Sequence, residues 1–233
     1  MSWVLGNWPQ IWQYGIAHVL LSFPPVIAGF LISLPLGWLA ARHRVTRGAL
    51  LAAGGVLYAI PSLPLFVLLP SIIGTKILDP LNVEVALTIY AVALLLRTTA
   101  DAFAAVDPGV RLSATAVGFG PWRRFLTVEL PLAGPVLLAG VRVVSVSTVS
   151  LVSVGSVIGV NSLGFFFLDG YQRSFPTEVW VGIVGTVLIA LVFDALLVLA
   201  GRLLMPWHAR LRRARRRSRV PAGQQPALAE VLR

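Results

Sequence analysis

Five long apolar segments alternate with short polar connections along most of this chain. They cover about residues 16–41, 49–73, 83–105, 132–160 and 179–205. A helix needs about 20 apolar residues to cross the ~30 Å hydrocarbon core of a bilayer, and each segment reaches that length. The composition agrees, since 57% of the 233 residues are hydrophobic and only 12% are charged. The sequence therefore predicts an all-α integral membrane protein with about five transmembrane helices.

The basic residues of the connections predict how these helices are oriented. Lys and Arg near span ends are retained on the cytoplasmic side of a membrane. The second and fourth connections hold only Lys76 and Arg173. The basic residues at or beside the first and third connections are Arg42, Arg44, Arg47, Arg97, Arg111, Arg123 and Arg124. We therefore expect the N-terminus outside, the C-terminus inside, and the connection of residues 107–131 inside.

The end of the chain is strongly basic. Nine of the nineteen Lys and Arg residues lie from Arg202 onward. Such a segment can bind nucleic acid or anionic lipid, but arginine beside a final span is typical of a topology anchor. We therefore expect a transmembrane domain over residues 1–206 and a basic cytoplasmic tail over 207–233. The tail is expected to contact membrane lipid, not nucleic acid, and its Pro, Gly and Gln content predicts disorder.

Residues 107–131 are more organised than a simple connection. Asp107 followed by Pro108 is a helix-start pair, because the carboxylate accepts hydrogen bonds from free amides and proline fits the first helical turn. Gly118 suits the left-handed turn that ends a helix. A glycine–proline pair then restarts a second short helix, and Pro131 is expected to open the next span. The spacing predicts two short helices joined at a glycine.

This segment resembles the cytoplasmic signature loop of binding-protein-dependent ABC import permeases. The loop pattern of that family is Glu-Ala-Ala, three residues, Gly, nine residues, Ile, any residue and Leu-Pro. Aligned on the glycine, the matching residues here are Leu112, Ser113, Ala114, Gly118, Val128, Leu130 and Pro131. The spacing from the glycine to Leu-Pro fits the pattern. Leu112 stands where the family has an acid, which puts in doubt any docking contact that uses the acid.

The resemblance implies a fold like that of type I ABC importer permeases, and it implies partners. In this family the loop is a coupling helix that seats in a groove on a cytoplasmic ATPase. ATP and Mg²⁺ therefore belong to that partner, and no cofactor and no catalytic residue are expected on this chain. A second permease, identical or paralogous, and an extracytoplasmic solute-binding protein are also implied, in the bacterial cytoplasmic membrane. The residues carried over as the coupling site are Asp107, Ala114, Gly118, Leu130 and Pro131.

The resemblance also extends beyond the loop. Four segments of the chain resemble permeases for quaternary amines such as glycine betaine, choline, carnitine and proline betaine. These segments are IPSLPLFVLLPSIIG, LLLRTTADAFAAVDP, VELPLAGPVLLAGVR and ALVFDALL. The implied function is import of such an osmoprotectant, driven by ATP. The alternatives are a permease for an amino acid or organic anion, a membrane-embedded enzyme, and a non-transporting accessory protein.

Two opposite charges fall at similar depth in the last two spans. Arg142 lies eleven residues after Pro131, and Asp194 lies eleven residues before Met205, where the chain runs back. A charge inside a bilayer is costly and normally has a partner. We therefore predict an Arg142–Asp194 ion pair. It either fixes helix register, which we favour, or contributes to the solute pathway.

Small and hydroxyl residues recur along one predicted face of the fourth span. At about 100° per residue, that face carries Arg142, Ser145, Thr148, Ser153, Ser156 and Gly159. Such residues permit close approach of helices in lipid. They equally suit the wall of a narrow wet passage, and the sequence does not choose between the two.

The other charged residues have ordinary structural explanations. Arg97 and Asp101 are four residues apart and are expected to pair locally on a helix. Glu129 is expected to pair with Arg124 or Arg123.

Asp169 and Glu178 are expected to be exterior charges. The chain contains no cysteine and three histidines, and the histidines lack metal-binding spacing. No metal site is therefore expected.

Overall fold

The computed structural model describes residues 2–207, and every regular element in that range is helical. The elements are α1 (Ser2–Gly6), α2 (Trp8–Ala40), α3 (Arg44–Ala59), α4 (Ser62–Ile73), α5 (Pro80–Ala104), α6 (Pro108–Ala116), α7 (Pro121–Arg124), the π-helical turn η1 (Phe125–Glu129), α8 (Leu130–Val152), the 3₁₀ segment η2 (Ser153–Ile158), α9 (Gly164–Gln172) and α10 (Pro176–Leu204). The all-α prediction is confirmed. The predicted basic tail lies outside the described residues from position 208 onward.

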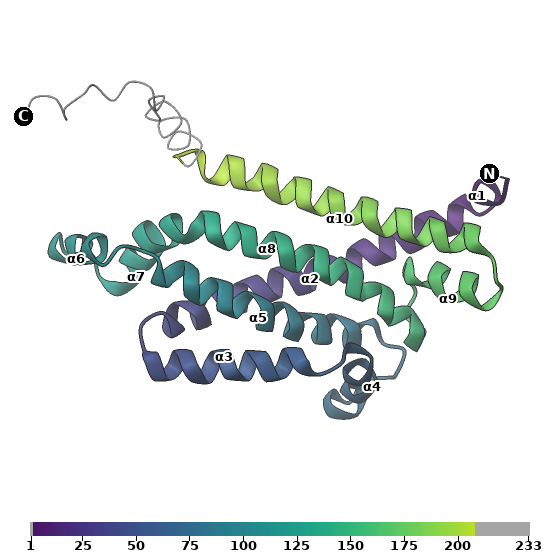
Figure 1. Cartoon of the computed structure of the whole chain (residues 1–233), viewed down its shortest axis with the longest axis horizontal. Helices are drawn as coiled ribbons and strands as arrows, with labels where there is room; N and C mark the ends of the chain where they lie inside the picture. Colours follow the sequence, from purple (N-terminus) through teal and green to yellow (C-terminus); the bar gives the residue numbers. More distant parts are fainter. Residues whose placement is uncertain (1, 208–233) are drawn as a thin grey trace, which may run out of the picture.

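The long helices run along the long axis of the molecule in alternating directions (Figure 1). Four are long and apolar enough to span a bilayer: α2, α5, α10 and the continuous helix Pro121–Ile158. The bent pair α3–α4 passes the same test when taken together and gives a fifth crossing if it is one broken span, so the four to five candidate spans agree with the prediction of about five. We call the end that carries α6 and α7 the loop end, and the end that carries α1 and α9 the opposite end. The chain begins at the opposite end, and α10 finishes at the loop end (Figure 1).

The expected span 49–73 is divided into two helices in the structure. Helix α3 begins earlier, at Arg44, and α4 leaves it at an angle of 101°. The break falls at Ile60 and Pro61, whose backbones are extended. Proline disfavours the helical conformation at the residue before it, which agrees with the position of the break. The Tyr90 hydroxyl donates to the Ile60 carbonyl that the break leaves without a helical donor.

Pro131, which was expected to open the fourth span, lies inside a longer continuous helix. The helix that starts at Pro121 continues through Pro131 to Ile158. Pro131 has no N–H, and in a regular helix its ring would clash with the carbonyl four residues earlier. The π turn over Phe125–Glu129 widens the backbone at that place, and Leu130 N–H donates to the Phe125 carbonyl five residues back. The second short helix of the loop is therefore rigidly continuous with the span.

Helices α2 and α5 form the centre of the bundle, and two glycines bring them together. A Cβ atom at Gly29 would lie 2.4 Å from the Ala91 side chain, and one at Gly37 would lie 2.4 Å from Thr99. Small residues permit this close approach, which drives helix association in lipid. Fully buried Phe103 extends the packing toward the loop end.

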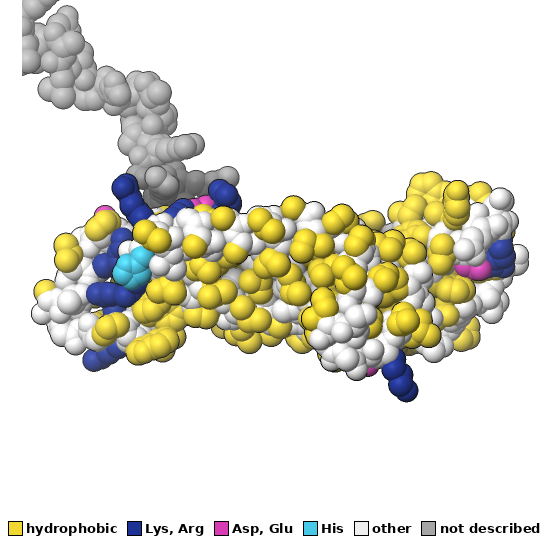
Figure 2. Space-filling model, turned by 90° about the horizontal axis from the view of Figure 1, so that it is seen from below, with side chains coloured by type: hydrophobic (Ala, Val, Ile, Leu, Met, Phe, Trp, Pro, Cys, Tyr) yellow, Lys and Arg dark blue, Asp and Glu magenta, His cyan; other side chains and the backbone are white. Residues whose placement is uncertain are grey.

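The outside of the bundle is largely apolar. Hydrophobic side chains cover the middle of the face shown in Figure 2, and Lys and Arg side chains lie mostly toward one end. Helix α10 is the most apolar span, and no residue in its most hydrophobic 18-residue window is buried. A surface of this kind is suited to lipid or to another membrane subunit.

Candidate coupling site and intramembrane polar residues

Helix α6 has the start and the stop that the sequence predicts. The Asp107 carboxylate accepts a hydrogen bond of 2.6 Å from the Gly109 amide. At the other end Gly118 has a φ of +90°, in the left-handed region that favours glycine. The Phe119 amide then donates to the Ala114 carbonyl at 3.0 Å. This turn reverses the chain between α6 and α7.

The outer surface of the loop is apolar as well as basic. Leu112 is 71% exposed, Val117 78% and Trp122 68%. Exposed apolar side chains that gather on a polar end of a protein mark a contact surface. Leu112, at the position of the family acid, therefore presents an apolar contact instead of a charge. Arg123 lies beside this surface, with its guanidinium 4.4 Å from the centre of the Phe119 ring.

Glu129 lies beneath the loop and is almost completely buried, with 1% exposure. Its carboxylate accepts hydrogen bonds from Trp38 Nε1 at 3.0 Å, from Arg42 at 3.2 Å and from Arg124 Nε at 2.8 Å. Of the two expected partners, the structure selects Arg124. Arg124 also donates to the Thr115 hydroxyl of α6 at 2.7 Å.

The donors from the end of α2 were not predicted. Trp38 and Arg42 lie about ninety positions before Glu129, so no sequence spacing indicates the contact. The Arg42 guanidinium also covers the Trp38 ring, 3.7 Å from its centre. Burial lowers the pKa of Arg42, and the adjacent Glu129 carboxylate opposes that shift. Arginine nevertheless remains protonated at physiological pH, so the buried acid is paired with positive charge.

The residues carried over from the family pattern do not form one patch. Asp107, Ala114 and Gly118 shape α6, where they set its start, its last turn and its stop. Leu130 instead packs against a buried cluster that includes Phe103 and Phe125. Pro131 follows it in the first turn of α8. The two groups are therefore the exposed helix and the base on which it is mounted.

The predicted ion pair between Arg142 and Asp194 is present. It joins α8 to α10 through two parallel hydrogen bonds, Nε–Oδ1 at 2.6 Å and Nη2–Oδ2 at 2.8 Å. Such a bidentate pair has strong directional preference. The two side chains are 43% and 29% exposed on the single chain. The pair therefore lies at the surface of this subunit and not in its core.

The small and hydroxyl residues of the fourth span are mostly buried. Ser145, Thr148 and Ser156 are at most 7% exposed. The Ser156 hydroxyl lies 2.8 Å from that of Ser162, which also accepts from the Gly164 amide. These contacts favour close packing over a wet wall within this subunit.

The single predicted face ends at Ser153. There the α-helix becomes a 3₁₀ helix, so the angle of 100° per residue no longer applies. Gly159 terminates that segment with a φ of +87°.

Two predictions about peripheral charges are wrong. Asp101 pairs with Arg47 across α5 and α3, not with Arg97, because the two helices lie side by side. Glu178 is 1% exposed and pairs with Arg173, which also contacts Asp169. A turn between α9 and α10 folds these three residues together.

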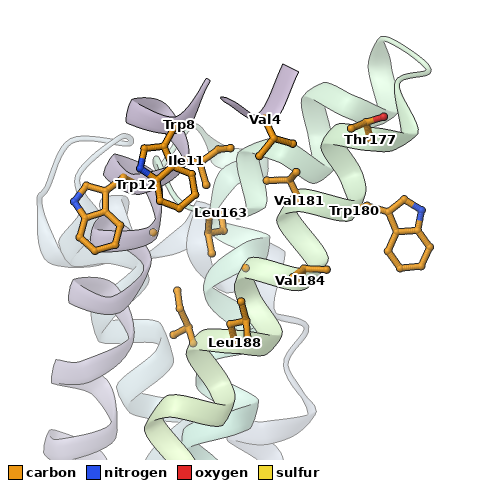
Figure 3. A pocket seen from close by; sticks show the side chains of 13 residues that line it. Val4, Trp8, Ile11, Trp12, Leu163, Thr177, Trp180, Val181, Val184 and Leu188 are labelled. Atoms are coloured by element: carbon orange, nitrogen blue, oxygen red, sulfur yellow. The ribbon is translucent and has the colours of Figure 1, made fainter. Parts of the chain in front are cut away.

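An apolar cavity of about 710 Å³ lies at the opposite end, between α2 and α10 (Figure 3). Trp8 and Trp12 line it from α2, and Val181 and Leu188 line it from α10. Its almost wholly apolar wall offers a polar solute little to hydrogen-bond. The cavity is better suited to an acyl chain.

Comparison with known proteins supports the same reading of the fold. The chain is 31% identical over 200 residues to the osmoprotectant import permease protein OsmW of Salmonella typhimurium, covering 84% of this chain and 93% of that protein. It is 29% identical over 189 residues to the choline transport system permease protein OpuBB of Bacillus subtilis, covering 81% and 86%. The fold matches an inward-facing MetNI methionine ABC transporter with a TM-score of 0.68 at 22% identity, over 85% of this chain and 97% of that chain.

Residues 33–213 match the family of binding-protein-dependent transport system inner membrane components. This match covers most of the chain, including the loop and the last four crossings. The helical architecture, the apolar surface and the organised loop agree with it. The chain is a membrane-spanning transport component, not an enzyme, and it belongs to the family of binding-protein-dependent transport system inner membrane components.

Proposed function

We propose that this permease imports a quaternary-amine osmoprotectant, of the glycine betaine, choline, carnitine or proline betaine class. The observation that carries the proposal is the similarity over more than four fifths of the chain to permeases named for osmoprotectants and choline. The alternative solutes, an amino acid or an organic anion, use the same architecture and are separated by the uptake experiment below.

The loop is proposed to dock on a cytoplasmic ATPase, which binds ATP and Mg²⁺. The exposed Leu112, Val117 and Trp122 side chains support this role, because they give α6 and α7 an apolar contact surface. This docking requires the loop end to lie in the cytoplasm. The arginine distribution supports that orientation.

A second permease is proposed to complete the transport pathway, either a copy of this chain or a paralogue. The unburied apolar side chains of α10 and the half-exposed Arg142–Asp194 pair support a further membrane contact. A charged pair that faces lipid is costly, whereas the same pair is tolerated against protein or water. We propose that the pair fixes the register of α8 and α10. A solute-binding protein is proposed to deliver the solute outside.

The proposed mechanism converts ATP-driven movement of the ATPases into movement of the spans. Closure of the ATPase pair displaces α6, and the continuous helix from Pro121 to Ile158 transmits the displacement into the bilayer. The spans then expose the solute pathway alternately to the two sides of the membrane.

Uptake by the complete transporter tests this function. The chain is expressed with its ATPase and solute-binding protein partners, and uptake of labelled choline, glycine betaine and carnitine is compared with uptake of methionine and histidine. We expect ATP-dependent uptake of at least one quaternary amine and competition among them. Uptake of only the amino acids would overturn the solute assignment, and absence of ATP-dependent uptake would overturn the transport function.

A further inference from the structure

A continuous set of polar contacts runs from the exposed loop helix to the end of the first span. It begins at Thr115 on α6, passes through Arg124 to Glu129, and ends at Trp38 and Arg42. We call these five residues the Glu129 network. Trp38 lies in the last turn of α2, and Arg42 follows that helix directly. The network therefore links the loop of residues 107–131 to the end of α2, which lies about ninety positions before Glu129.

Helix α6 has few other means of holding its position. All of its residues are at least partly exposed. Within residues 2–207, the Arg124–Thr115 hydrogen bond is the one side-chain hydrogen bond from α6 to another element. Because α6 has few contacts with the bundle, this hydrogen bond is the main side-chain interaction that fixes its position.

Glu129 is the centre of the network for an electrostatic reason. Its buried carboxylate has hydrogen bonds of 2.8 Å and 3.2 Å to two guanidinium groups. Removal of its charge would leave two arginines competing for a neutral acceptor, and a charged hydrogen bond contributes about twice as much as a neutral one. The Glu129 carboxylate therefore holds the guanidinium groups of Arg124 and Arg42 at one place.

We propose that Glu129 is a positioning residue that makes α6 and the end of α2 move as one body. The inference rests on the proposed docking of the loop on an ATPase. Without the Glu129 carboxylate, α6 would move with the ATPase and the end of α2 would not follow it. ATP would then be hydrolysed with less transport, because the force on the loop would reach α8 but not the first span.

The test compares uptake with ATP hydrolysis in the complete transporter, reconstituted in proteoliposomes with its ATPase and binding protein. We expect Glu129→Gln to keep the bound ATPase and its hydrolysis, and to lower the solute transported per ATP by about five-fold or more. Asp101→Asn is the matched control, because it removes a carboxylate from another arginine pair at the same end. This control should keep the wild-type ratio.

Thr115→Val provides a second test that strands no buried charge. Thr115 is exposed, and the change removes the hydrogen bond from Arg124 together with the bond of the Thr115 hydroxyl to the Arg111 carbonyl within α6. The ratio of transport to hydrolysis should fall by about two- to ten-fold, as expected for loss of one typical intramolecular hydrogen bond at an exposed site. Thr115→Ser, which keeps the hydroxyl, should restore the ratio. If Glu129→Gln does not accumulate in the membrane, this pair of variants decides the question.

Two results would overturn the inference. One is a parallel fall of uptake and hydrolysis in Glu129→Gln and Thr115→Val, which would indicate a purely structural role. The other is a wild-type ratio in both variants. Measurements on the wild-type transporter separate failure of the Glu129 inference from failure of the proposed function. If the binding protein does not stimulate ATP hydrolysis in the wild-type transporter, the proposed function and the Glu129 inference are both overturned.

Discussion

Arg142 and Asp194 show how far a single pair of residues can be predicted. The matched depth of the two charges indicated the contact, and the structure has both hydrogen bonds. Arg142→Asp alone should place two acids together in the membrane and lower the amount of folded protein several-fold. Arg142→Asp combined with Asp194→Arg should recover most of it. Fluorescence-detected gel filtration of the protein in detergent measures this, and no recovery in the double variant would contradict the pairing.

Gly118 is expected to be sensitive for its backbone, not for lack of space. Its φ is +90°, and within the described part of the chain an added Cβ would meet no atom closer than 4 Å. Gly118→Val should therefore cost about 1–3 kcal/mol of local strain and lower ATP-dependent uptake, whereas Gly118→Asn should be milder because asparagine tolerates this region.

Gly120 provides the control for this experiment. Its surroundings are equally open, but its φ is −65°, which any residue adopts. Gly120→Ala should transport at the wild-type rate. Equal losses at both positions would show that the loop is sensitive to size and not to backbone conformation.

Among single residues, the burial of the acids Glu129 and Glu178 was the hardest property to predict from the sequence. Glu129 was correctly expected to pair with a neighbouring arginine, but its contacts with Trp38 and Arg42 depend on how α2 ends against the loop. Glu178 was expected outside and is buried by Arg173 and the turn before α10. In both cases the partner comes from tertiary packing, for which the sequence contains no periodic signal.

At the scale of elements, the contact between α2 and α5 gives a steric prediction. Gly29→Val would place a side chain where the Ala91 methyl group already lies, and overpacking of this kind costs about 1–3 kcal/mol. The melting temperature of the purified protein in detergent should fall by several degrees. Gly55→Val on α3 should have little effect, because the described residues leave open space around Gly55. An equal fall for both variants would contradict the assignment of α2–α5 as the central contact.

The existence of the helices was predictable from apolar length, and their interruptions were not. Pro61 and Pro131 are both prolines within apolar segments. The chain nevertheless bends by 101° at Pro61 and continues as a helix through Pro131. The difference lies in the neighbours. Tyr90 satisfies the carbonyl freed at the first proline, and a widened turn accommodates the second. Neither compensation has a signature in the local sequence.

For the whole molecule, the orientation in the membrane is a prediction that the lack of cysteine makes easy to test. A single cysteine at exposed Ser113 of α6 should react with a membrane-impermeant maleimide only in inverted vesicles. One at exposed Gln172, at the end of α9, should react only in cells or spheroplasts whose cytoplasmic membrane is intact. The opposite pattern would place the loop outside and remove the basis for docking an ATPase.

The overall architecture follows from composition more directly than its assembly does. Apolar length predicts a bundle of membrane-spanning helices, and the described chain begins at one end of this bundle while α10 finishes at the other (Figure 1). The apolar surface that α10 leaves uncovered has no equivalent prediction. Whether lipid or protein covers such a surface depends on shape, and hydropathy is the same for both.

The π turn before Leu130 has a consequence for how related permeases diverge. Such a turn holds one more residue than a regular α-helical turn, and one residue corresponds to about 100° of rotation. Deletion of a single residue between Phe125 and Glu129 would therefore swing α6 and α7 around the axis of α8 without altering any membrane crossing. A permease lineage can in this way re-aim the exposed surface of α6 and α7 through one codon.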